Sequence, residues 1–308
     1  TDVVTVAAGD KVCVSATGTG TPTAAGAVYW TCKFIPDTAG ETVLLGNSGT
    51  DTWTIALNFE TLVGGKFDDN IVFDAQTLFP TAGTLKKFYC ELGTAPGAGT
   101  SRTFTIEKNG IDSGITITIS DTNTTGNDIT NTLAVAAGDK IAIQQTAVTG
   151  TPAASVGKFG IVFLPDTQGE WFTAATTDDT LSTTATEYQH LTCGDSTLTA
   201  TENEQYNLAQ ATTAKAIYVA LSVDPGTSPD AYSFTLRQNG TTNTALTVTI
   251  TADATTGNYA TDGAISADDL LSTAIAPLNV PTGTPASQIA YLFYNAPTGE
   301  ETLTYRTR

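Results

Sequence analysis

The sequence predicts an all-β protein made of tandem jelly-roll-like β-sandwich domains. Three observations predict this fold class: a strand-favouring composition, a repeat of domain size, and apolar residues at alternate positions between turn signals. Charged residues make up only 14% of the 308 residues, where roughly a quarter is usual. Threonine and valine favour strands, and the Glu, Lys and Arg of surface helices are scarce.

Two kinds of block alternate along the chain. The X block begins with "VAAGDKVCV" at Val6, with "VAAGDKIAI" at Val135 and, more diverged, with "ISADDLLST" at Ile265. The Y block lies between the X copies and carries an Asn-Gly pair at Asn109 and again at Asn239. The order X-Y-X-Y-X amounts to two and a half repeats of about 130 residues. That period is the size of a whole sandwich domain, and solenoid and propeller repeats are far shorter.

Alternating apolar residues predict strands with one face toward a core. The run "YWTCKFIPD" of the first X block places Trp30, Cys32 and Phe34 on one face. The equivalent positions of the second X block are also apolar: Phe159, Ile161 and Phe163. The Asn-Gly pairs stand between two strand-like runs, where they favour a type I′ hairpin turn.

This pattern predicts three segments. Residues 1–48 are a half repeat, an X block without a preceding Y block, which a neighbour completes; residues 49–176 and 177–308 are two β-sandwich units. A lone X block exposes unpaired strand edges. Three explanations are open: a Y block missing from this chain, packing of the X block on its own neighbours, or strands supplied by another subunit.

Composition also limits the partners. The formal net charge is −18 and the isoelectric point is near 4.1, which disfavours nucleic-acid binding. No apolar run approaches the ~20 residues of a membrane helix, so we expect no membrane insertion. The chain starts at Thr1 and contains no Met, which indicates a trimmed N-terminus. We therefore expect an extracellular, cell-surface or virion location.

Three stretches of the sequence carry a family resemblance: "APGAGTSRTFTIEKNGIDSGITITIS", "TTGNDITNTLAVAAGDKIAI" and "TGTPAAS". Together they resemble the tandem jelly-roll repeat modules of uncharacterised surface and virion structural proteins, phage-like or environmental. The resemblance covers residues 80–166 and 211–297. It implies a jelly-roll sandwich and brings no catalytic residue. The last X copy departs from the pattern, since Asp268 replaces Gly138.

No constellation of residues predicts catalysis, so we expect a protein that is not an enzyme. His190 is the only histidine, and without a nucleophile motif it is interpreted as a polar surface residue. Glu41, Glu170 and Glu300 recur after each "PDT" or "APT". Because no second acid recurs with them, they are interpreted as strand-edge residues and not as a glycosidase pair.

The loop "DTNTTGND" holds the best calcium candidates, which are weak: Asp121, Asn123 and Asp128. Calcium takes six to eight oxygen ligands, and this loop lacks the D-x-D-x-D-G spacing. Loop capping is therefore the favoured interpretation. We expect no cofactor, with calcium as the single alternative.

Four cysteines allow up to two disulfides. Cys32 and Cys90 both lie on predicted core faces and are the candidate pair. Free buried thiols fit equally well, because the equivalents of these two residues are ordinary core residues. Cys13 is expected to face outward.

The sequence thus predicts a non-enzymatic structural protein that assembles with itself. The expected product is an extracellular filament, or a virion shell or appendage, held by β-strand contacts between subunits of a homopolymer. The alternative is a carbohydrate-binding or adhesive module with surface glycans as partners. Such a module needs exposed aromatic side chains, for which Trp53 and Trp171 are the candidates.

Overall fold

The computed structural model describes residues 4–15, 17–21, 29–68, 73–192, 197–296 and 301–306. The fold is 54% strand and 1% helix, which confirms the all-β prediction. Antiparallel sheets are packed face to face as sandwiches. Within the described part of the chain, no helix is long and apolar enough to cross a membrane.

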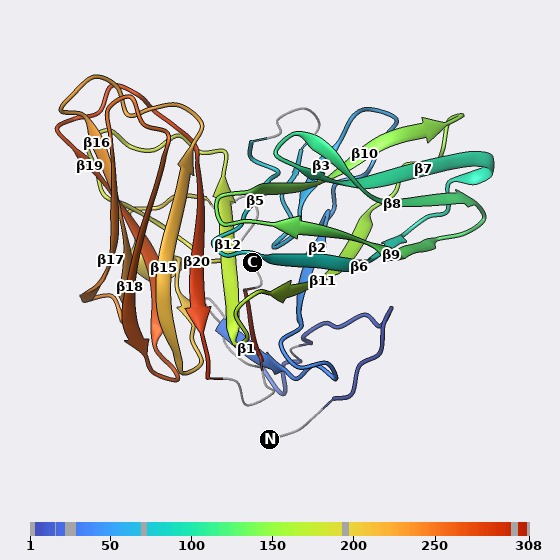
Figure 1. Cartoon of the computed structure of the whole chain (residues 1–308), viewed down its shortest axis with the longest axis horizontal. Helices are drawn as coiled ribbons and strands as arrows, with labels where there is room; N and C mark the ends of the chain where they lie inside the picture. The colour runs from blue at the N-terminus through green and yellow to red at the C-terminus, as the bar shows by residue number, and fades with distance from the viewer. Residues whose placement is uncertain are drawn as a thin grey trace.

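The first sandwich consists of two sheets, seen at the right of Figure 1. The first sheet has the order β2 (Thr42–Asn47), β11 (Gly157–Pro165), β6 (Gly83–Leu92) and β9 (Thr125–Val135). The second has the order β4 (Phe67–Asp68), β3 (Phe59–Thr61), β10 (Lys140–Thr149), β7 (Gly97–Lys108) and β8 (Ile111–Asp121), with β5 (Thr77–Leu78) also paired to β10.

The second sandwich repeats this order at the left of Figure 1. Its first sheet is β12 (Glu170–Thr177), β20 (Ser287–Tyr294), β15 (Thr212–Leu221) and β18 (Thr256–Ile265). Its second sheet is β13 (Glu187–Gln189), β19 (Leu270–Leu278), β16 (Ala231–Gln238) and β17 (Thr242–Thr251), with β14 (Asn207–Leu208) paired to β19. In both sandwiches the first strand lies beside the last, which is the jelly-roll arrangement.

The strand pairing moves the boundaries that the sequence predicted. Strand β2 belongs to the first sandwich, so residues 42–47 are not part of a half repeat that extends to residue 48. Strand β12 belongs to the second sandwich, so that unit begins by residue 170 and not at residue 177. The reason is that the first strand of each jelly roll pairs with its last strand, which lies in the following X block.

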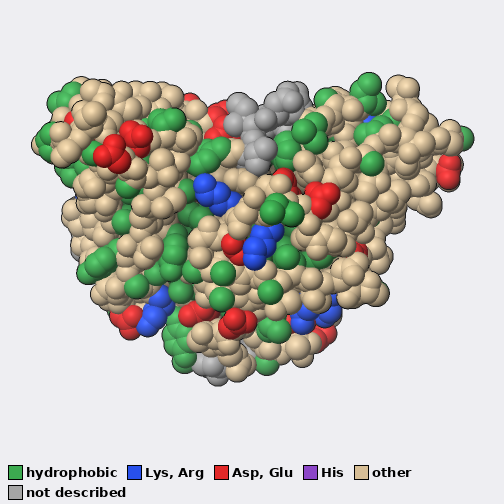
Figure 2. Space-filling view, turned by 45° about the horizontal axis from the view of Figure 1, so that its top comes forward, with side chains coloured by type: hydrophobic (Ala, Val, Ile, Leu, Met, Phe, Trp, Pro, Cys, Tyr) green, Lys and Arg blue, Asp and Glu red, His purple; other side chains and the backbone are tan. Residues whose placement is uncertain are grey.

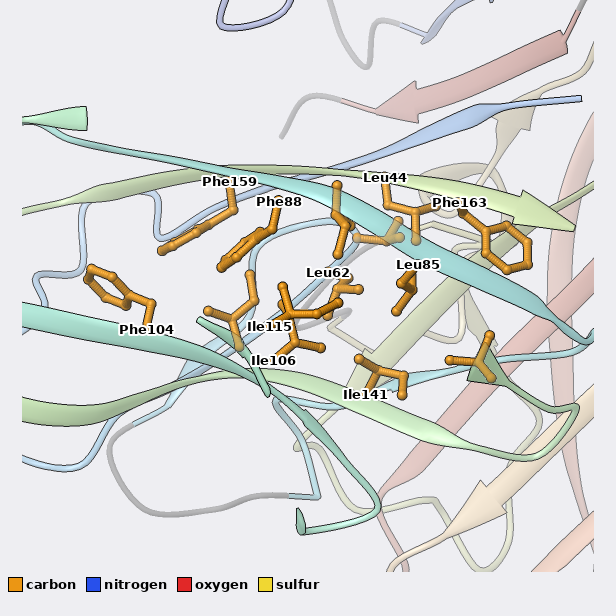
Figure 3. Packing of buried hydrophobic residues seen from close by; sticks show 14 of the residues in the cluster. Leu44, Leu62, Leu85, Phe88, Phe104, Ile106, Ile115, Ile141, Phe159 and Phe163 are labelled. Carbon is orange, nitrogen blue, oxygen red and sulfur yellow. The ribbon is translucent and has the colours of Figure 1, made fainter. Parts of the chain in front are cut away.

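Each sandwich is filled by the apolar residues that the alternation predicted. In the first, Phe88 and Phe159 from one sheet face Phe104 and Ile106 from the other, as Figure 3 shows. The second has its own core cluster, which includes Phe234 and Phe293. Full burial of each such side chain stabilises the fold by about 1.5–3 kcal/mol.

The two sandwiches pack directly on each other. Phe172, on the outer face of the second sandwich, lies against Phe79 with ring centroids 4.8 Å apart. Thr81 donates a hydrogen bond to Glu170, and Lys66 forms an ion pair of 2.8 Å with Asp178. The end of the first sandwich near β5 therefore covers the outer face of the sheet in the second sandwich that contains β12 and β20.

Candidate assembly interface

The two ends of the chain meet in a separate two-stranded sheet. Strand β1 (Tyr29–Phe34) pairs antiparallel with β21 (Glu301–Arg306), so that Phe34 lies opposite Glu301 and Cys32 opposite Leu303. This pair, called the ribbon below, lies between the two sandwiches at the bottom of Figure 1.

The register of the ribbon is that of the first and last strands of each sandwich. In the repeat, Phe34 is equivalent to Phe163 and to Phe293. Phe163 lies opposite Thr42, and Phe293 lies opposite Trp171. Both of these partners are equivalent to Glu301, so all three pairs have one register. The ribbon is thus the first-and-last strand pair of a third jelly roll, built from opposite ends of the chain.

The ribbon also has the same neighbouring strand as the first-and-last strand pair of the second sandwich. Strand β5 of the first sandwich contacts β12 and β20, and its equivalent β14 of the second sandwich contacts β21 and β1. The ribbon therefore sits on the second sandwich as the second sandwich sits on the first.

The N-terminal segment, residues 4–15, completes a ring of contacts. Lys11 forms an ion pair of 2.6 Å with Glu91 on β6 of the first sandwich. The first sandwich thus contacts the second, the second contacts the ribbon, and the segment ahead of the ribbon returns to the first. This exposed pair contributes little energy by itself.

A turn in the N-terminal segment has the geometry of its repeat equivalents. Asp10 accepts a hydrogen bond of 2.8 Å from the backbone N–H of Ala7. Asp139 accepts the same bond from Ala136 at 2.8 Å, and in the last X block Asp269 accepts one from the residue three positions before it. The "AAGD" turn therefore forms in residues 7–10 although the strands on either side of it do not.

In the two complete sandwiches an asparagine of the Y block caps this turn. Asn109 donates to Asp139 at 2.7 Å and accepts from the backbone N–H of Lys140 at 2.9 Å. Asn239 makes the same two bonds with Asp269 and Leu270. In the sequence, the one signal of this contact is the recurrence of Asn and Asp at the repeat offset, which does not by itself predict that the two side chains meet.

The N-terminal segment exposes side chains that are buried elsewhere in the repeat. Val12 is 68% exposed and Val14 is 55% exposed. Their equivalents Ile141 and Ile143 are 0% and 1% exposed, because β10 packs against the Y block. The segment thus has the alternating apolar sequence of a core strand, but no opposite sheet packs on Val12 and Val14 in the described part of the chain.

The calcium candidates are not brought together. Asp128 accepts hydrogen bonds from Thr116, Thr130 and Asn131. Burial raises the pKa of its carboxyl, but these bonds outweigh burial and lower it to about 2. Asp121 caps a different loop, through the N–H of Gly99. Among the described residues, no group of three His, Cys, Asp or Glu is placed to hold a metal ion.

The cysteine pair is not bonded in the structure. Cys32 and Cys90 are both free thiols, the first exposed on β1 and the second buried in β6. The two strands lie in different sheets, so the disulfide that the sequence allowed does not form. Cys13 is free and exposed, and Cys193 lies outside the described residues.

The candidate catalytic base and acids that the structure describes are buried or bonded to neighbouring residues. His190 is buried, so the prediction of a surface residue is wrong. It directly follows the short strand β13, which ends at Gln189.

Glu41 forms ion pairs with Lys86 and Lys87. Burial raises the pKa of Glu41, but the two lysines outweigh it and lower that pKa. Glu170 lies at the junction of the sandwiches, and Glu300 lies outside the described residues.

Among the acidic residues that the structure describes, Glu60 on β3 is the most buried. Neither of its carboxylate oxygens has a hydrogen-bond partner within the described residues. Burial raises its pKa well above the ordinary value. The strand register makes Gln189 its equivalent in the second sandwich, and this amide side chain is also buried.

Both candidate tryptophans are core residues. Trp53 is fully buried and meets Phe67 and Phe104 edge to face. Trp171 is stacked on Phe293 at 4.5 Å. The surface in Figure 2 consists mostly of neutral polar side chains and backbone, with charged residues scattered over it.

Comparison with protein-family models finds no match. Comparison with curated proteins finds no significant match either.

Proposed function

We propose that this protein is a non-enzymatic structural protein whose copies join through β-strand contacts into an extracellular filament, or into a virion shell or appendage. The observation that carries the proposal is the ribbon of β1 and β21. Its two strands come from opposite ends of the chain, yet they pair in the register of a jelly roll's first and last strands.

Such a pair is suited to exchange between copies. When β21 of one copy pairs with β1 of the next, every backbone contact of the ribbon is retained. An exchange that runs head to tail from each copy to the next, and does not close on itself, produces an open polymer. The acidic surface, with a net charge of −18, keeps the copies soluble until specific strand contacts form.

The carbohydrate-binding alternative has no supporting observation. Its two candidate tryptophans are at most 5% exposed, and a sugar-binding site of the lectin kind needs aromatic faces open to solvent.

A cysteine introduced at Leu303 tests the proposal. Leu303 lies opposite Cys32 in the ribbon, and cross-strand Cβ atoms about 4.5–5.5 Å apart are near enough for a disulfide after small adjustments. Leu303→Cys is made in a background in which Cys13 and Cys193 are serine. Oxidation of concentrated protein should give a ladder of covalent oligomers on a non-reducing gel.

The matched control carries Cys32→Ser in addition, and it should give no ladder. A product that is cross-linked only within single chains, from protein at the highest soluble concentration, would show that the ribbon stays intramolecular. That result would overturn assembly by strand exchange.

A further inference from the structure

We infer that the N-terminal segment, residues 4–15, forms an acceptor surface for a Y-type hairpin from outside these 308 residues. A Y-type hairpin means two antiparallel strands joined by an Asn-Gly turn, as β7 and β8 are joined at Asn109 and Gly110. The inference concerns contacts that β21 does not make, so it does not depend on the proposed exchange of β21.

The turn at Asp10 carries the chemistry of recognition. In both sandwiches the Y-block asparagine has a positive φ, 53° for Asn109 and 55° for Asn239, which aims its amide at the X-block turn. Its backbone N–H also donates to the residue after the aspartate, Lys140 or Leu270. Asp10 and Lys11 present the same acceptor and backbone groups in the turn already formed, and no asparagine caps them within the described residues.

The strand after the turn supplies the apolar part of the surface. In the first sandwich, Ile141 lies opposite Lys108 and Ile143 opposite Ile106 along β7. The equivalent residues Val12 and Val14 are exposed. A strand of β7 type that paired here would cover both valines and remove their apolar surface from water, which favours binding.

Strand β1 has a separate open edge, which in the two sandwiches is filled by β6 or β15, Y-block strands that lie outside the Asn-Gly hairpin. Strand β11 is flanked by β2 and β6, and β20 by β12 and β15. In the described part of the chain, β1 has only β21 beside it. Cys32 is correspondingly exposed, whereas its equivalents Ile161 and Tyr291 are buried.

A second copy of this chain is not the occupant. The chain has three X blocks and two Y blocks, and each Asn-Gly hairpin already caps its own X turn. A copy that lent its hairpin would open one of its own sandwiches and leave that core exposed. The occupant is therefore a hairpin of Y type that these 308 residues do not have free.

A peptide tests the inference on the full chain. The probe is the segment 101–118, "SRTFTIEKNGIDSGITIT", labelled with fluorescein and titrated with the intact protein while anisotropy is measured. We expect saturable binding and slower amide exchange of residues 4–15 in the complex. The Asn109→Ala peptide should bind about tenfold more weakly, because it loses the capping hydrogen bonds.

Two protein variants locate the site. Asp10→Ala should weaken binding of the unchanged peptide by about tenfold, and the matched control Asp37→Ala, at another exposed aspartate, should leave it unchanged. Absence of saturable binding, or equal binding by Asp10→Ala, would overturn the inference. So would dimers of the protein alone in which residues 4–15 are protected, since a second copy would then be the occupant. Amide exchange on the unaltered protein gives a readout that requires no variant. If the peptide does not bind but the cross-linked ladder through Cys32 forms, only the acceptor surface is overturned and the proposed strand exchange stands.

Discussion

Arg102 and Tyr232 occupy equivalent positions in the two sandwiches, and each donates a hydrogen bond to the equivalent loop of its own sandwich. Arg102 donates a hydrogen bond of 2.9 Å to the carbonyl oxygen of Ala153. Tyr232 donates one of 2.9 Å to the carbonyl oxygen of Gly283, the residue equivalent to Ala153. Both side chains are fully buried. Two chemically different side chains thus donate to the carbonyl oxygen at one repeat position, and in each unit this contact links the loop before the last strand to the core.

Arg102→Ala should lower the free energy of unfolding by about 3 kcal/mol, because the buried side chain of Gln145 loses its donor and the carbonyl oxygens of Thr54 and Ala153 each lose a hydrogen bond from the guanidinium. Urea denaturation followed by tryptophan fluorescence measures this. The control Lys158→Ala removes a cation from an exposed position and should cost less than about 0.5 kcal/mol. Equal effects of the two variants would contradict the assignment of Arg102 as a loop anchor.

Asp139→Ala should destabilise the protein more than Asp10→Ala does. Asp139 accepts hydrogen bonds from Ala136 and Asn109 and pairs with Lys108 at 2.7 Å, so its loss should cost about 2 kcal/mol. Asp10 makes only the turn bond with Ala7 among the described contacts, and its loss should change stability by about 0.5 kcal/mol. Thermal unfolding of both variants measures the difference. A larger loss for Asp10→Ala would show that the N-terminal turn is already capped.

Asp128 should make stability depend on pH in acid. Its folded pKa of about 2 lies below the ordinary value of 3.8. The carboxylate therefore stabilises the fold fully above the ordinary value, and this contribution disappears as the pH falls toward the folded pKa. The free energy of unfolding of wild type and of Asp128→Asn, from urea titrations, should differ near neutral pH and converge near about pH 2.

The matched control for this titration is Asp37→Asn, at an exposed aspartate. It should track the wild type at every pH. A constant gap between wild type and Asp128→Asn down to the lowest pH would contradict the role given to the carboxylate.

The thiols should differ in reactivity. Cys13 and Cys32 are exposed, and Cys90 is buried. Burial raises the pKa of Cys90 well above its ordinary value, and the carboxylates of Glu60 and Glu91 raise it further. Because the thiolate is the reactive form, maleimide should label the first two in the native protein and Cys90 only after unfolding. Mass spectrometry of labelled peptides checks this, with urea-denatured protein as the control, and rapid native labelling of Cys90 would contradict the buried position.

The sequence by itself determined the fold class, the repeat and most of the core. Alternation is sufficient for this, because successive side chains of a strand point to opposite faces. Phe104, Phe159 and Phe163 are all buried as that pattern predicts. The first Asn-Gly pair also forms the predicted two-residue hairpin: Lys108 lies opposite Ile111, with Asn109 and Gly110 at positive φ. In the second sandwich Gln238 lies opposite Thr242, so that hairpin loop has a third residue, Thr241.

Only the tertiary structure decided which strands became partners. Neither the alternation nor the repeat states that β2 joins the sandwich after it, or that β1 meets β21 from the other end of the chain. The buried positions of His190 and Trp53 likewise follow from packing between sheets and not from local sequence. The physical reason is that the alternation of side chains specifies which face of a strand is buried. The neighbours of that strand are joined to it by backbone hydrogen bonds, and because nearly every residue carries the same backbone donor and acceptor, the local sequence does not specify the partner.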